Sequence, residues 1–258
     1  MKFELKERLI VYFDVLGYKY AFSESNFNAL VYLEKIKAIL SETKRMFSGD
    51  NPFPDIMIKM FSDNVCLIFD GEKGSQALYV KVILSELQKQ FLCEYDMLIR
   101  GAIVRGYIYA DDEIVFGQGL IDCVDLEGKA NFPRIILQDG LEDEFMEDGY
   151  ICVEKGFDGK YEILYLKQDA DDIDDKDIKD LQRSILRVVS DNCACEEDDS
   201  KEVLQKKEKL IDKYVWLIES FNFYNSGYGY GISYRIDINF ENSCKRLFLL
   251  GGGFSRRM

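Results

Sequence analysis

The chain of 258 residues contains no histidine. This absence excludes Ser-His-Asp and Cys-His catalysis, histidine-ligated zinc and histidine proton shuttles. Only 3 prolines are present, and no apolar run approaches the roughly 20 residues needed to span a bilayer. The first eight residues are rich in charge, so we expect no signal peptide and a cytoplasmic protein. Any chemistry must use carboxylates, amines, hydroxyls, thiols or a bound metal.

Positive charge is also scarce. Lys and Arg number 33 against 47 Asp and Glu, which gives a formal net charge of -14. Such a surface repels phosphate backbones, and the basic clusters are short, so we expect no nucleic-acid partner. A divalent cation would reverse the field locally for a small phosphorylated substrate. The 47% hydrophobic content is ample for a packed core.

Hydrophobic periodicity predicts an alternation of strands and helices over the first two thirds of the chain. The expected strands are 9–13, 56–61, 64–69, 98–109 and 134–137, and the expected helices are 30–40, 75–92 and 120–129. The order β-α-β-β-α-β is typical of an α+β fold, a ferredoxin-like or palm-like sandwich. We expect a mostly antiparallel sheet with helices over one face.

The composition shifts near residue 168, where an Asp-rich segment begins. We therefore expect a domain at 1–167 and a C-terminal helical extension at 168–258. Two helices are expected there, the second at 200–221 with a broad apolar face, followed by a terminal strand ending near residue 240.

Two acidic residues stand in apolar surroundings. Asp14 ends the first strand, and Asp63 lies at the tip of the hairpin between 56–61 and 64–69. If these strands are neighbours, the carboxylates converge and must share a proton or bind a cation. Mg²⁺ or Mn²⁺ fits best, and a metal on such a pair can polarise a phosphoryl group and activate a hydroxyl. The alternative is a pair of unrelated surface aspartates in turns.

Four segments resemble the catalytic domain of class III nucleotide cyclases. Phe13-Asp14-Val15-Leu16-Gly17-Tyr18 resembles the first metal motif, and Lys59-Met60-Phe61-Ser62-Asp63 resembles the Lys-x-x-Gly-Asp hairpin, with serine in place of glycine. Arg100-Gly-Ala-Ile-Val-Arg-Gly106 is similar to a later core strand. Ile114-Val-Phe-Gly117 through Leu126-Glu127 is similar to the segment that carries substrate and transition-state residues. The four occur in family order within residues 8–140.

The resemblance implies that Asp14 and Asp63 bind two metal ions, with the Val15 carbonyl as a further ligand. It implies that Lys59 recognises the base of a nucleoside triphosphate, and that Ile114 occupies the second base-reading position. The triphosphate would be held by backbone N–H groups of the segment after Asp14, which includes Gly17, Tyr18 and Lys19. Class III sites form between two subunits, so a homodimer is also implied.

The chain departs from the family pattern where charge develops at phosphorus. The positions of the transition-state asparagine and arginine fall on Ile121 and Asp125, a loss worth several kcal/mol of charge stabilisation if nothing replaces it. Arg134 is the leading candidate for a compensating catalytic cation, with Lys129 and Arg105 as others. The Phe-Gly-x-x-Leu, Leu-Glu and Pro-Arg-Ile arrangement is similar to divergent bacterial cyclases of antiphage signalling, including the pyrimidine cyclases of the Pycsar systems.

Three functions remain open from the sequence. The first is a cyclase that converts a nucleoside triphosphate to a 3′,5′-cyclic nucleotide and pyrophosphate, possible pyrimidine specificity following from the Pycsar resemblance. The second is a catalytically degenerate cyclase-like domain that binds a nucleotide or a partner protein. The third is a palm-type polymerase making cyclic dinucleotides, which the absence of a Gly-Gly-Asp-Asp or Gly-Gly-Asp/Glu-Glu-Phe motif disfavours.

Overall fold

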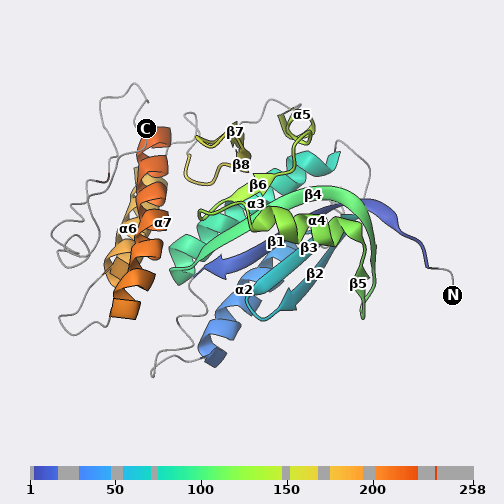
Figure 1. The fold of residues 1–258 in the computed structure, drawn as a ribbon, viewed down its shortest axis with the longest axis horizontal. Coiled ribbons are helices and arrows are strands. Elements are labelled where there is room, and N and C mark those ends of the chain that lie inside the picture. The colour runs from blue at the N-terminus through green and yellow to red at the C-terminus, as the bar shows by residue number, and fades with distance from the viewer. Residues whose placement is uncertain are drawn as a thin grey trace. The chain divides into compact units, whose positions relative to one another are not determined.

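The structure, a computed structural model, describes residues 3–16, 29–47, 55–70, 75–146, 152–167, 175–193 and 201–225, together with residue 236. Contacts divide the chain into two compact units, Met1–Tyr165 and Leu166–Met258 (Figure 1). None of the helices in these described stretches is long and apolar enough to cross a membrane.

An eight-stranded sheet forms the centre of the first unit. Its strands are β1 (Lys6–Leu16), β2 (Asp55–Phe61), β3 (Asn64–Asp70), β4 (Leu98–Ala110), β5 (Val115–Phe116), β6 (Ile135–Leu137), β7 (Val153–Lys155) and β8 (Tyr161–Ile163). The spatial order is β2-β3-β1-β4-β6-β8-β7, and β5 pairs with β4. Among the described strands, β4 and β6 pair in parallel and the other pairs are antiparallel. This arrangement confirms the predicted α+β class with a mostly antiparallel sheet.

Two long helices cover one face of this sheet. The apolar side chains of α2 (Ala29–Phe47) and α3 (Ser75–Tyr95) pack against alternate residues of β1, including Leu9, Val11 and Phe13. Phe13 meets Phe91 of α3 edge to face, with ring centroids 6.0 Å apart. The period-2 alternation of β1 therefore sends its odd-numbered side chains into this core.

A shorter helix, α4 (Gln118–Glu127), lies on the opposite face, in front of β1 and β4 in Figure 1. Here Cys123 of α4 packs with the even-numbered Ile10 of β1 and Ala102 of β4. The expectation that the helices cover one face is therefore wrong. We call this side of the sheet the α4 face.

Two glycines allow α4 to approach the sheet so closely. A Cβ on Gly106 of β4 would lie 2.6 Å from the Cα of Gly119, and a Cβ on Gly119 would lie 2.5 Å from Cδ1 of Ile10. Because real Cβ atoms do not approach other heavy atoms so closely, helix and strand meet backbone to backbone here.

The second unit contains α6 (Asp175–Cys193) and α7 (Lys201–Asn225), which pack against each other. Asn222 of α7 donates its side-chain amide to the carbonyl of Ile236 (2.9 Å) and accepts from the N–H of Ile236 (2.7 Å). Apart from Ile236, the predicted terminal strand lies outside the described residues.

Candidate functional site

The two aspartates singled out by the sequence lie on neighbouring parts of the sheet. Asp14 pairs in register with Asn64, the residue after Asp63. The N–H of Val15 donates to the carbonyl of Asp63 at 3.1 Å, so the hairpin turn is tied to the end of β1. Because Phe13 and Val15 point into the core with α2 and α3, Asp14 points to the α4 face.

The turn that carries Asp63 has an unusual backbone. Ser62 has a φ of 61°, in the left-handed region that favours glycine. Positive φ at the first central residue of a two-residue loop is the requirement of a type II′ hairpin turn, which explains the glycine of the family pattern. Asp63 is buried, with 8% of its surface exposed, and its Oδ1 accepts from Nδ2 of Asn64 at 3.2 Å.

Tyr12 lies two residues before Asp14 and so shares the α4 face with it. Burial raises the pKa of the Tyr12 phenol, and nearby acidic groups, beginning with Glu127, raise it further. Asp14 and Asp63 are both among these groups. The charges of Asp14 and Asp63 therefore both raise the pKa of the Tyr12 phenol. The period-2 pattern of β1 could have identified Tyr12, which the sequence analysis missed.

Arg100 of β4 stands directly opposite Asp14 in the register. Its Nε lies 3.2 Å from Oδ1 of Asp14, and its Nη2 lies 2.9 Å from Oδ2. The same Nη2 is 2.5 Å from Oε1 of Glu127, a buried residue at the end of α4. Arg100 and Glu127 lie within the quoted motifs, but no sequence signal singled them out as partners of Asp14.

Lys59 and Ile114, the two predicted base-reading residues, meet at the turn formed by residues 111–114. Nζ of Lys59, on β2, donates to the carbonyl of Asp112 at 2.5 Å. The N–H of Ile114 in the same turn donates to Oδ1 of Asp111 at 2.7 Å. The side-chain hydrogen bond from Tyr109 and the N–H groups of the turn hold the pKa of Asp111 below its usual value. Ile114 is 49% exposed and offers the turn's apolar surface.

The remaining expected residues are placed unevenly. Gly17, Tyr18 and Lys19 lie outside the described residues. Ile121 and Asp125 are exposed on α4, whose buried residues are Gly119, Cys123 and Glu127. Because those three residues face the sheet, Ile121 and Asp125 lie on the outer side of the helix.

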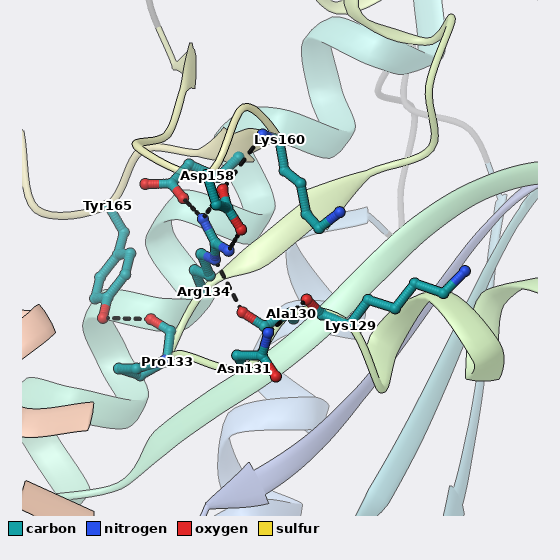
Figure 2. Close-up of polar contacts among 9 residues, drawn as sticks. Lys129, Ala130, Asn131, Pro133, Arg134, Asp158, Lys160 and Tyr165 are labelled. Atoms are coloured by element: carbon teal, nitrogen blue, oxygen red, sulfur yellow. Dashed lines mark hydrogen bonds and ion pairs between the residues drawn. The ribbon is translucent and has the colours of Figure 1, made fainter. Parts of the chain in front are cut away.

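Arg134 does not occupy the position expected of a compensating cation. Its side chain is buried (2% exposed), and Nε donates to the carbonyl of Ala130 at 3.0 Å. Its Nη1 lies 2.6 Å from Oε2 of Glu162, and its Nη2 lies 2.5 Å from Oδ2 of Asp158 (Figure 2). The guanidinium thus joins β6 to the β7–β8 hairpin. Because these donors are committed inside the protein, we infer a structural role for Arg134 in place of the predicted catalytic one.

The other two candidate cations also differ from expectation. Arg105 pairs in register with Leu9, whose side chain faces α2 and α3, and it forms an ion pair with Glu144. It therefore lies on the face opposite Asp14. Lys129 follows α4, and its exposed side chain extends away from Arg134 (Figure 2).

The donors at Asp14 and Asp63 fit a hard divalent cation in kind. Carboxylate oxygens are the ligands that Mg²⁺ and Mn²⁺ prefer, and Mg²⁺ commonly uses one or two protein carboxylates with water and substrate phosphates. Within the described residues there is no group of three or more Cys, Asp or Glu side chains arranged to hold a metal.

Comparison with known proteins addresses the fold. No family model and no curated protein matches the sequence. The structure is similar to the guanylyl cyclase domain of the RhoGC fusion protein from the aquatic fungus Blastocladiella emersonii, with a TM-score of 0.50 and 12% identity over 64% of this chain and 98% of that chain. An adenylate/guanylate cyclase/hydrolase from Silicibacter pomeroyi matches with a TM-score of 0.45 and 16% identity, over 63% of this chain and 96% of that one. The first likeness places the fold with those of class III nucleotide cyclase catalytic domains.

Proposed function

We propose that this chain is a nucleotide cyclase, which converts a nucleoside triphosphate to a 3′,5′-cyclic nucleotide and pyrophosphate. One observation supports the proposal above all: the carbonyl of Asp63 accepts from the N–H of Val15, the residue after Asp14, so the backbones of the two predicted metal ligands are neighbours. The cyclase-like fold supports it.

The residues of this chain would divide the work as follows. Asp14 and Asp63, with the Val15 carbonyl, would hold Mg²⁺ or Mn²⁺, which when bound polarises the α-phosphate and lowers the pKa of the ribose 3′-hydroxyl. Lys59, already donating at the 111–114 turn, would donate to an acceptor on the base. Ile114 would select the base by shape. Gly17, Tyr18 and Lys19 would contact the triphosphate.

We also propose that the active form is a homodimer. Apolar side chains are exposed on α4 and on the strand that leads into it: Phe116 (68%), Ile121 (55%) and Val124 (39%). Ile121 and Asp125 lie on the outer side of α4, where a second copy could meet them. Light scattering after size exclusion should give a dimer, and Ile121→Asp should give a monomer; a wild-type monomer at assay concentration would contradict the proposal.

The cyclase proposal is tested by incubating the protein with ATP, GTP, CTP or UTP and Mn²⁺, then separating the products by ion-exchange chromatography. We expect a cyclic mononucleotide that is lost in Asp14→Ala and in Asp63→Ala. Asp139→Ala removes an exposed carboxylate in the turn after β6 and should retain wild-type activity. Product from CTP or UTP would support the pyrimidine specificity that the resemblance to antiphage cyclases implies; product from ATP or GTP alone would contradict it.

The catalytically silent alternative also has a specific observation in its favour. Ile121 and Asp125 carry no cation at the positions of the family's transition-state residues, and Arg100 engages both oxygens of Asp14. Metal-dependent nucleotide binding without any product in this assay would establish this alternative. A dinucleotide product would instead favour the polymerase reading.

A further inference from the structure

The carboxylate of Asp14 is already paired with a cationic side chain, that of Arg100. Arg100 approaches both of its oxygens at once, through Nε at 3.2 Å and Nη2 at 2.9 Å. The side chains of Arg100 and Asp14 are 22% and 20% exposed, so water screens this pair only in part. Two-point pairing of this kind is among the stronger charge-assisted contacts in proteins.

A divalent cation and this guanidinium compete for the same group. The guanidinium occupies the side of the carboxylate from which both oxygens can be reached, and it places a positive charge there. A metal ion that ligates Asp14 must therefore displace Arg100 or bind against its charge.

Glu127 provides a second ion-pair partner for Arg100. Its Oε1 is 2.5 Å from the same Nη2 that contacts Asp14, and its side chain is 11% exposed. Release from Asp14 would thus leave Arg100 bound to a buried carboxylate and would not leave its charge uncompensated. The movement required is small, because the contact with Glu127 already exists.

We propose that Arg100 is a positioning residue that holds Asp14 when no metal is bound and is retained by Glu127 alone when a divalent ion takes Asp14. The inference rests on the proposed function, since it assumes that Asp14 is a metal ligand. It assigns the Arg100–Glu127 pair a role in metal affinity, and it links occupation of the site to the end of α4, the helix that carries Ile121 and Asp125.

The test measures Mn²⁺ binding to the full chain without nucleotide, by the electron paramagnetic resonance signal of free Mn²⁺. Arg100→Lys keeps the charge but loses the two-point contact, and we expect it to bind Mn²⁺ roughly tenfold more tightly than wild type. Glu127→Gln removes the charge of the second ion-pair partner, and we expect Mn²⁺ affinity to fall by roughly the same factor. Arg105→Lys, on the same strand but the other face, should leave affinity unchanged.

The opposite signs of the two variants separate this role from a merely structural one. If Arg100→Lys binds Mn²⁺ as wild type does or more weakly, or if no variant binds Mn²⁺, the proposal is wrong. Glu127→Gln keeps the proposal testable should Arg100→Lys fail to fold, and an unchanged affinity there would also overturn it. Suppose that Asp14→Ala loses turnover while Arg100→Lys binds Mn²⁺ with wild-type affinity. The cyclase proposal would then stand, and the proposed role of Arg100 would not. Tighter Mn²⁺ binding in Arg100→Lys, with no turnover in wild type, would support the role of Arg100 and contradict the cyclase proposal.

Discussion

Arg134 gives the sharpest test of sequence-based against structure-based assignment, because the two disagree about its role. Arg134→Met removes the hydrogen bonds to Asp158, Glu162 and the Ala130 carbonyl. The side chain of Glu162 is 5% exposed and would keep a buried charge, whereas that of Asp158 is 35% exposed and can be hydrated again. Breaking such a buried pair from one side costs roughly 3–5 kcal/mol. For a unit of this size, we expect a Tm loss of about 10 °C.

The measurement is thermal unfolding followed by circular dichroism, together with hydrogen exchange of the β6 and β8 amides. Trp216, the single tryptophan, lies in α7 and gives a separate signal for the second unit. Arg45→Met is the matched control, because Arg45 pairs with Glu42 on the surface of α2 with 75% of its side chain exposed. Its effect on Tm should be negligible, because water screens an ion pair between exposed groups.

A second variant tests the cause of the loss. Adding Glu162→Gln to Arg134→Met removes the uncompensated charge, so the double variant should recover part of the lost stability. The structural assignment would be refuted if Arg134→Met kept wild-type Tm and amide protection while turnover disappeared. That result would instead support the predicted catalytic role of Arg134.

Ser62→Gly should stabilise the first unit by about 0.5–1 kcal/mol in urea titrations, because the φ of 61° strains serine but not glycine. Ser41→Gly, at an exposed position inside α2, should destabilise it by about the same amount, and equal losses in both would contradict the argument. Gly106→Ala should cost about 1–3 kcal/mol by forcing α4 from the sheet, whereas Gly128→Ala, where the nearest atom to a new Cβ is 3.6 Å away, should have little effect on Tm. Against the opposing effect of burial, the ion pair with Arg134 holds the pKa of Asp158 below its ordinary value. That contribution is present above about pH 4 and is lost as the pH falls through the folded-state pKa, so Asp158→Asn should weaken the acid dependence of unfolding.

The sequence predicted best the strands, helices and hairpin that depend on local residue patterns. The strand carrying Asp14, the hairpin carrying Asp63 and the two long helices follow from alternation and helical spacing, and each is present with modest shifts at its ends. The strand β1 extends from Lys6 to Leu16, beyond its apolar run, because its pairing with β4 continues over the whole of that length, whereas β3 pairs only with Leu9–Asp14.

What the sequence could not predict is which groups face one another. The position of α4 depends on the contact between Gly106 and Gly119, and periodicity does not show which face of a sheet a short helix will cover. Arg134 was assigned to the site from its place in a motif, but its partners Asp158 and Glu162 lie on a hairpin that the periodicity did not reveal. Arg100 stands 86 residues from Asp14, and only the strand register shows that they meet.

The charges on the α4 face connect metal binding to substrate binding. Asp14, Asp63 and Glu127 contribute three negative charges against the one positive charge of Arg100, a net of -2 by these four side chains (-3 + 1), within a chain whose formal charge is -14. A polyanionic triphosphate is repelled by such a centre unless a divalent ion reverses the local field. We therefore expect nucleotide affinity to rise with Mn²⁺ concentration in wild type and to lose this dependence in Asp14→Asn. Nucleotide binding of equal strength with and without the metal would show that the triphosphate does not bind at these carboxylates.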